Sequence, residues 1–357
     1  MKNKLLFTFL SAFIFFGGLT FGQLEDLKIS GHWFLNFKAG KKKTEDINKF
    51  DITRGYLNIE KSLGNGFSAR LTPDITLDEE GSDAGNVELR LKYAYLKYKF
   101  DDFAFFTNPY FEVGVVHRPF FGFEQKINPY RVQGKMFMDR FKVIGTTDYG
   151  ISFFALLGGK LDKKYQKEVS KAYPGKYGSF SIGIYNGGGY HAIEENKNKT
   201  IETRLTVRPL WSVLPNLQLT YFGAFGKGNT AEMPDLAVHA GVLTFEHQKF
   251  TLIGQYYTGE GNSAGTAIIN SNTSHDQKGY SLFAEIKVLP KRLAIFGRYD
   301  NFTKEKSKDE EHKAIVFGAA YKLNKGVKLV ADFDASKKDN AAYDDNSMFK
   351  VSLEVKF

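Results

Sequence analysis

The feature that most limits the fold of this chain is a short alternating segment that recurs along its length. In each copy, apolar and polar residues alternate over about ten residues, the pattern of a β-strand with one apolar and one wet face. In the stretch VELRLKYAY (87–95), for example, apolar and aromatic residues occupy one parity while Glu88, Arg90 and Lys92 occupy the other. Charges this regular on a strand require water along one face.

The repeat predicts about sixteen strands, separated by connections of two lengths. The segments lie at 28–38, 50–61, 67–77, 87–99, 110–117, 150–159, 177–186, 200–209, 216–226, 236–246, 249–258, 279–289, 292–301, 313–323, 326–335 and 348–357. Short turns such as 62–66 and 324–326 alternate with long polar loops at about 39–49, 78–86, 187–199, 259–278, 302–312 and 336–347. Segment 161–176 is long where a short turn is expected, so it is either an excursion or a sign that the count is wrong by a hairpin.

An even number of strands, with short turns at one end and long loops at the other, predicts a transmembrane antiparallel β-barrel. Closure is required because hydrocarbon offers no partner to the backbone groups of a free sheet edge. A soluble β-sandwich or β-solenoid would rarely carry so many aromatic residues at strand ends, where they suit interfacial girdles. These residues are Tyr56, Tyr93, Tyr95, Tyr221, Phe225, Tyr256, Tyr280, Tyr299, Phe333 and Phe349.

The first residues have the pattern of a signal peptide, with Lys2 and Lys4 before an apolar run and a small-residue site before Gln23. We therefore expect a signal peptide over 1–22, export, and one barrel domain over 23–357. The chain has no cysteine, which excludes disulfides, thiolate metal sites and cysteine nucleophiles. No later window approaches 18 uninterrupted apolar residues, so we expect no spanning helix.

A long stretch without clean alternation, residues 115–150, interrupts the strand pattern. It combines phenylalanines and tyrosines, which favour burial, with charged residues that require water or anions. A loop folded into a wide barrel satisfies both demands and narrows the channel to a filter. Its charged residues are therefore candidates for a constriction: Arg118, Glu124, Lys126, Arg131, Lys135 and Arg140.

An ordered set of motifs resembles the porin family of the phosphate-selective porins O and P, in its Bacteroidetes-type form. The resemblance covers essentially the whole mature chain and is carried by RGYLNIEKSLGNGFSARLTPDI (54–75), LRLKYAYLKY (89–98), VGVVHRPFFGFEQKINPYR (113–131), IYNGGGY (184–190) and GRYDNF (297–302). It implies a sixteen-stranded outer-membrane channel, a homotrimer, an inward-folded third loop and a basic pore. Selectivity for phosphate does not carry over, because the inward positions of this chain mix both signs of charge.

The inward parity of the strands adds further pore candidates. The basic ones include Arg54, Arg70, Arg90, Arg204 and Arg298. Basic candidates outnumber acidic ones modestly, so we expect a passive porin for small hydrophilic solutes with a weak to moderate preference for anions, phosphate among them. The alternative that stays open is that many of these charges form cross-strand pairs in an unselective lumen.

Two other classes of function stay open, a barrel enzyme of the outer-membrane protease or lipase type and a structural or adhesive surface barrel. The chain has no H-E-x-x-H, G-x-S-x-G or G-x-x-x-x-G-K-[ST] motif, so we expect no enzymatic activity, catalytic residue, metal or cofactor. His117 is either pore-lining or structural. Export and evenly scattered charge exclude nucleic acid as a partner, and the expected partners are outer-membrane lipid, the assembly machinery and small anionic or polar solutes.

The stretch SMFKVSLEVKF (347–357) predicts a last strand with an apolar lipid face, which closes the sheet against the strand near residue 28. Its terminal Phe357 resembles the signal by which the outer-membrane assembly machinery recognises its clients. We predict that deleting Phe357 lowers the yield of assembled barrel and leaves the conductance of assembled barrels unchanged. The yield is measured as the heat-modifiable fraction on gels, and an unchanged yield would count against this role.

Overall fold

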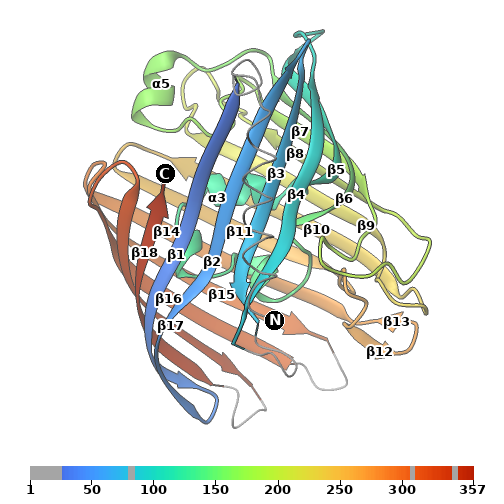
Figure 1. Ribbon diagram of the computed structural model, residues 1–357, viewed down its shortest axis with the longest axis vertical. Helices are drawn as coiled ribbons and strands as arrows, with labels where there is room; N and C mark the ends of the chain where they lie inside the picture. The colour runs from blue at the N-terminus through green and yellow to red at the C-terminus, as the bar shows by residue number, and fades with distance from the viewer. Residues whose placement is uncertain (1–25, 79–84, 306–309, 340–344) are drawn as a thin grey trace, which may run out of the picture.

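The structure is a computed structural model that describes residues 26–78, 85–305, 310–339 and 345–357. The predicted signal peptide, 1–22, lies outside the described residues. Over the described residues the alternating segments form a closed antiparallel barrel of sixteen strands (Figure 1). The barrel strands are β1 (Leu27–Lys42), β2 (Glu45–Gly64), β3 (Phe67–Leu77), β4 (Val87–Lys99), β5 (Phe106–His117), β6 (Thr147–Leu157), β7 (Gly178–Tyr185), β8 (Thr200–Val207), β9 (Leu217–Lys227), β10 (Asp235–Glu246), β11 (Phe250–Glu260), β14 (Asp276–Leu289), β15 (Leu293–Lys304), β16 (Glu310–Lys322), β17 (Val327–Lys338) and β18 (Asn346–Lys356).

Each predicted segment overlaps one of these strands, which confirms the sixteen-stranded barrel. The long loop predicted at 39–49 is wrong, because β1 and β2 continue as a hairpin and only Lys43 and Thr44 connect them. Lys38 and Asp51 pair across this hairpin at 2.8 Å. Strands β15 and β16 likewise continue into the loop predicted at 302–312.

Segment 161–176 is an excursion between β6 and β7, and the strand count stands. It contains the short helix α5 (Lys163–Glu168), whose first turn is capped by the Asp162 carboxylate, which accepts a hydrogen bond from the Tyr165 amide at 2.7 Å. Gln248, in the short turn between β10 and β11, donates a 2.7 Å hydrogen bond to Glu168. The excursion therefore lies at the short-turn end of the barrel (Figure 1).

The outer face of the barrel is apolar, and the inner face carries the polar parity. On β8, for example, Ile201 is 47% exposed on the outside, whereas Glu202 beside it is 0% exposed inside. The outward residues include Tyr221, Phe225, Tyr256, Tyr280 and Phe349, which supports their predicted place on the lipid face.

Three predicted girdle residues, Tyr56, Tyr93 and Tyr95, face the lumen instead. Strand β4 carries one extra residue opposite Thr72 and Pro73, since Thr72 pairs with Tyr93 and Pro73 pairs with Leu91. The extra residue is Lys92, and a β-bulge of this kind reverses the parity that follows it. Arg54 donates a 3.0 Å hydrogen bond to the Tyr56 hydroxyl, which places that ring on the basic inner face.

The two ends of the described barrel meet at the β1–β18 seam, as the sequence predicts. Strand β18 pairs antiparallel with β1 from His32 opposite Lys356 onward. The Phe357 ring contacts Trp33 edge to face, with 5.7 Å between the ring centroids, and lies over Gly31, where a Cβ would clash with it. Backbone hydrogen bonds of 2.9 and 3.2 Å join Gly31 and Phe357.

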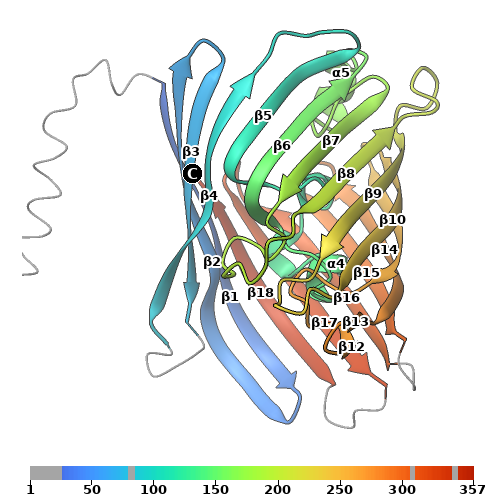
Figure 2. The same cartoon turned by 90° about the vertical axis from the view of Figure 1, so that its right-hand side faces the viewer.

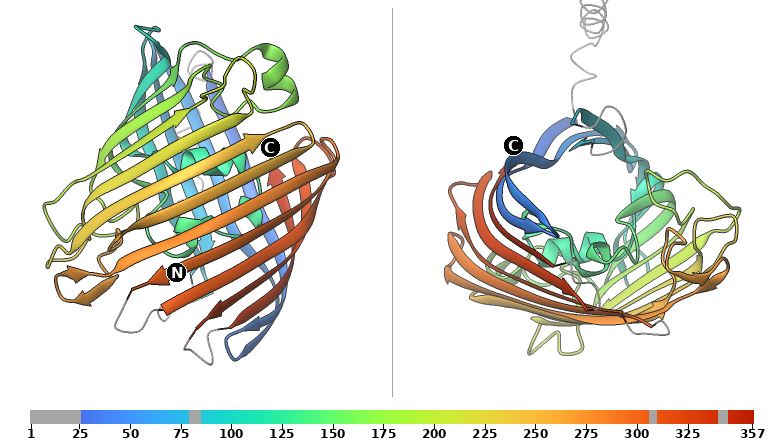
Figure 3. Two further views of the ribbon diagram at one scale, coloured as in Figure 1. Left: turned by 180° about the vertical axis from the view of Figure 1, so that it is seen from behind. Right: turned by 90° about the horizontal axis from the view of Figure 1, so that it is seen from below.

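Residues 118–146, here called loop L3, fold into the barrel as predicted. Loop L3 holds α3 (Phe121–Ile127), the 3-10 turn η1 (Arg131–Gln133) and α4 (Phe137–Arg140). Viewed along the barrel in Figure 3, these turns lie inside the ring of strands, on the side of the later strands. Figure 2 shows α4 beside β15 and β16. Among the described residues, no helix has the length and apolar character that crossing a membrane requires.

Candidate pore constriction

Loop L3 has one face packed against the inner wall of the barrel. The wall strands that it covers, β9–β11 and β14–β17, turn apolar residues inward among polar ones, and the apolar residues form one buried cluster with the loop. Tyr130 stacks on Phe296 with 4.1 Å between the ring centroids, and Phe141 stacks on Phe302 at 4.6 Å. Each fully buried phenylalanine contributes about 2 kcal/mol. The loop residues in the cluster are Phe120, Phe121, Phe123, Ile127, Tyr130, Val132, Met136, Phe137, Met138, Val143 and Ile144.

Two of the predicted pore arginines hold the start of loop L3 and do not reach the water of the lumen. Arg118 is completely buried against Glu202 of β8, to which its Nε donates at 2.7 Å. Arg204, two residues along the same strand, donates from Nε to the Pro119 carbonyl at 3.0 Å and lies over the Phe123 ring. Both guanidinium groups therefore hold the start of loop L3 against β8.

Two further predicted pore arginines, Arg140 and Arg298, belong to an ion-pair network under the loop. Arg140 binds Asp334 with two hydrogen bonds of 2.8 and 3.4 Å. Arg298 lies 2.9 Å from Asp300 and donates to the Lys135 carbonyl at 3.0 Å. Both arginines are therefore paired, as the alternative left open by the sequence expects, but not across neighbouring strands. Arg298 pairs with an acid of its own strand, and Arg140 pairs from the loop to β17.

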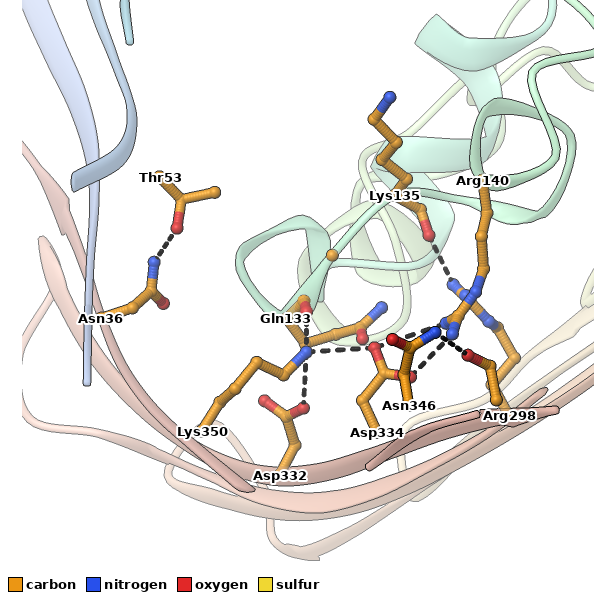
Figure 4. Close-up of polar contacts among 12 residues, drawn as sticks. Asn36, Thr53, Gln133, Lys135, Arg140, Arg298, Asp332, Asp334, Asn346 and Lys350 are labelled. Carbon is orange, nitrogen blue, oxygen red and sulfur yellow. Dashed lines mark hydrogen bonds and ion pairs between the residues drawn. The ribbon is translucent and has the colours of Figure 1, made fainter. Parts of the chain in front are cut away.

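Lys350 of β18 joins the same network to the loop backbone. Its ammonium group lies 3.1 Å from Asp332 and 3.2 Å from Asp334, and it also donates to the Gln133 carbonyl (Figure 4). Figure 4 shows the wall side chains reaching toward the loop, while the side chain of Lys135 points away from the wall. The network holds equal numbers of cations and acids, so it adds little net charge to the lumen.

The end of loop L3 is held by the connection between β11 and β14. The Ser263 amide donates to the Val143 carbonyl at 3.0 Å, and the Asn262 side chain donates to the Lys142 carbonyl at 3.3 Å. Inside the packed face, Glu124 accepts a 2.9 Å hydrogen bond from Gln255. Burial raises the pKa of Glu124 to about 7, because its carboxylate has lost water without gaining a cation in direct contact.

The free face of loop L3 lies opposite β2–β4, and the charged residues on the two sides form a cluster that we call the constriction cluster. Lys135 exposes 48% of its side chain and Arg131 exposes 11%. Burial lowers the pKa of Arg131, and the facing Arg54 guanidinium lowers it further. The cluster consists of Arg54, Arg90, Lys92, Arg131 and Lys135 with the acids Asp74, Glu88 and Asp139.

The acids of the constriction cluster neutralise only part of its positive charge. Asp74 pairs with Arg90 at 3.3 Å, and Asp139 lies 3.5 Å from Arg131 and 3.7 Å from Lys135. With five cations and three acids, the cluster is net positive. A charged ring at the narrowest part of a pore has more influence on ion selectivity than the total charge.

The remaining predicted residues lie on the lumen surface beside this cluster. Arg70 of β3 donates to Asn58 and Thr72 at 2.7 and 2.9 Å. Lys126 is exposed at the end of α3, on the side of the short turns, where its ammonium lies over the Tyr173 ring. His117 contacts Glu112 at 2.8 Å between rings of Tyr93 and Tyr95, so it is held by partners and also faces the lumen.

Sequence reasoning missed one lumen residue from the loop 186–199. The Tyr190 hydroxyl donates to Asp74 at 2.8 Å, and Lys92 and Arg90 lie over its ring. The next residue, His191, has a lowered pKa because of burial and the nearby Arg90 and Lys92 cations. The Gly-rich stretch before Tyr190 indicates a loop, but nothing in the sequence indicates that the loop turns inward.

A second basic region lies at the short-turn end of the barrel, between loop L3 and the short turns. A cavity of about 760 Å³ opens there between Tyr130, the excursion after β6 and the turns that follow β14 and β16. Ten cations and three acids line it: Lys167, Lys171, Lys249, Lys287, Lys291, Arg292, Lys322, Lys325, Lys328 and Lys356 against Glu168, Glu285 and Glu354. In the described part of the chain, no group of His, Asp and Glu residues is arranged to hold a metal ion.

Comparison with solved structures finds outer-membrane porins of the same architecture. The anion-selective porin from Comamonas acidovorans has a TM-score of 0.63 at 12% identity, over 93% of this chain and 99% of that one. Salmonella typhi OmpF in complex with daunomycin has a TM-score of 0.64 at 11% identity, over 95% and 99%. The outer membrane channel DcaP of Acinetobacter baumannii has a TM-score of 0.57 at 11% identity, over 93% and 97%.

Neither protein-family models nor curated protein sequences match the chain. At 11 to 12% identity, the structural likeness shows the fold. The chain thus has a porin-type barrel of sixteen strands, and this fold with its apolar outer face indicates the outer membrane.

We predict that Arg118→Ala destabilises the folded protein by about 3 kcal/mol or more, because it leaves Glu202 buried without its cation. The measurement is the free energy of unfolding from denaturant titration in micelles. Lys227→Ala is the matched control, since Lys227 pairs with Asp235 at 2.5 Å on the surface and should cost about 1 kcal/mol or less. The double variant Arg118→Met, Glu202→Gln should recover part of the loss. An equal loss of unfolding free energy in Arg118→Ala and Lys227→Ala would contradict the role of Arg118 in holding loop L3.

Proposed function

We propose that this protein is a passive outer-membrane porin whose channel favours small anions. The observation that carries the proposal is the net positive constriction cluster between loop L3 and β2–β4. Water reaches this face of the loop, as the 48% exposure of the Lys135 side chain shows. The fixed cations raise the local concentration of anions and lower that of cations.

The basic cavity at the short-turn end supports the same preference. An anion that passes the constriction meets a second region in which cations outnumber acids ten to three. Arg118, Arg140 and Arg298 contribute little to this field, because each is paired with a carboxylate. Arg204 is fully buried against the Pro119 carbonyl, which binds its guanidinium group without cancelling the charge. We therefore place the selectivity on Arg54, Arg131, Lys135 and the cavity lysines.

Phosphate is a reasonable member of the solute class, and the phosphate-selective porin O and P family is the specific family that we propose. The support is the ordered set of motifs in the sequence. We also propose a homotrimer in outer-membrane lipid, assembled by the outer-membrane machinery. One similar structure, Vibrio cholerae OmpT, is described in a trimer form, with a TM-score of 0.57 at 11% identity.

We predict ohmic conductance in planar bilayers and a reversal potential of the sign for anion preference in a KCl gradient. Arg131→Ala and Lys135→Ala should each lower the chloride-to-potassium permeability ratio about twofold, since a unit charge about 8 Å away in water is worth about 0.5 kcal/mol. Lys313→Ala is the control, because Lys313 pairs with Glu311 at 2.6 Å at the end of β16 and does not belong to the cluster.

Two results would contradict the proposal. Folded, heat-modifiable barrels without any conductance would exclude a porin. A reversal potential of the sign for cation preference would exclude the anion channel and leave the porin intact.

A further inference from the structure

We propose that the lumen wall opposite loop L3 is a binding track for small acidic carbohydrates. The inference rests on the proposed porin function and names the class of solute that the channel takes. It comes from six aromatic side chains that line the lumen from the constriction to the short-turn end, here called the aromatic track: Tyr190, Tyr93, Tyr95, Tyr110, Phe154 and Tyr173.

The rings follow one another closely along β4, β5 and β6. Tyr93 and Tyr95 have 6.2 Å between their ring centroids, and Lys97 lies over both Tyr95 and Tyr110, at 5.5 and 4.2 Å. The Tyr110 and Phe154 ring centroids are 5.0 Å apart, and those of Phe154 and Tyr173, in the excursion after β6, are 5.5 Å apart. Tyr173 also packs on Phe123 of loop L3 at 5.3 Å, so this end of the track meets the loop. A solute moving along this wall would pass from one ring to the next.

Local irregularities of the strands place these rings inside the barrel. The bulge at Lys92 turns Tyr93 and Tyr95 inward, and a second register shift separates Thr107 from Tyr110. Bulges often re-aim side chains at functional sites. Tyr95 is 8% exposed and the other five rings are half-buried, so most of the track keeps some contact with water.

Cations accompany the rings along the whole track. Arg70 lies 4.6 Å from the Tyr93 centroid, Lys92 lies 4.5 Å from Tyr190 and Lys126 lies 4.9 Å from Tyr173. Glu112 neutralises Lys97 at 2.9 Å. Each of these cations lies over a face of its ring, and the His117 ring lies 4.3 Å from that of Tyr93, so a solute meets only the part of each ring that these groups leave exposed. The positive charges along the track are only partly balanced.

This combination matches a solute that has a ring with an apolar face and also carries an acid group. The C–H face of a sugar ring packs on an aromatic side chain, while hydroxyl and carboxylate groups bind the neighbouring cations. An inorganic anion has no apolar face to pack on the rings, and a neutral sugar has no negative charge to pair with the cations. A sugar with a carboxylate, such as a hexuronate, uses both features.

The test measures block of the open channel by three probes: digalacturonate, maltose and phosphate. Digalacturonate should block the current at a lower concentration than maltose or phosphate. Tyr93→Leu and Tyr110→Leu should each raise its half-blocking concentration about fivefold, because a ring contact is lost. Tyr256→Leu is the matched control, since Tyr256 is 53% exposed on the outer face. Tyr93→Phe keeps the ring and should keep the block.

Calorimetric titration of the folded protein in micelles with digalacturonate separates this inference from the proposed function. Binding that Tyr93→Leu and Tyr110→Leu weaken supports the track, whether or not a bilayer conducts. Absent conductance would refute the porin. Block or binding of digalacturonate no stronger than that of phosphate or maltose, or equal in wild type and both leucine variants, would overturn the track.

Discussion

The packing of loop L3 against the inner wall of the later strands is the interaction on which the rest of the lumen depends. A loop with eleven buried apolar side chains cannot stay in water, and the barrel offers it an apolar surface on β9–β11 and β14–β17. Once the loop lies there, that half of the barrel is filled. The passage for solutes is then bounded by the free face of the loop and by the strands opposite, β2–β6.

The same packing separates the charged residues into two groups with different roles. Arg118, Arg140 and Arg298 lie under or at the start of the loop, each paired with a carboxylate, and Arg204 binds the Pro119 carbonyl beside them. A buried pair of this kind mainly fixes geometry, because the cost of removing both charges from water offsets much of their attraction. The cations on the free face keep contact with water, and in the proposed function they set the field that a passing ion meets.

The barrel could be predicted from the sequence, because lipid outside and water inside impose a period of two on every strand. The same reasoning failed where one residue changes the register: the bulge at Lys92 turns Tyr93 and Tyr95 inward without altering the composition of the segment. The pairing of Arg118 with Glu202, 84 residues away, could not be predicted either, since both residues fit a pore lining equally well.

One signal in the sequence could have placed loop L3 more closely. Strand β10 has Leu236, Val238 and Ala240 on its inward parity, where a wet lumen would require polar side chains. Strands with apolar residues on both parities therefore mark the wall that the loop covers. Clean alternation, as in β4 before its bulge, marks the wall that faces water.

Loop L3 divides the lumen into a wall that it covers and a wall that faces water. Chemical labelling of single cysteines tests this division most directly, and the absence of native cysteine makes it straightforward. Lys135→Cys and Arg54→Cys place a thiol at the constriction, whereas Val238→Cys and Val316→Cys place it under the loop. An anionic methanethiosulfonate reagent added to an open channel should reduce the current at the first two positions. It should leave the last two unlabelled, because both are buried. Equally rapid labelling at Val238→Cys, with a fall in current, would show that water passes on the other side of the loop and would contradict the account.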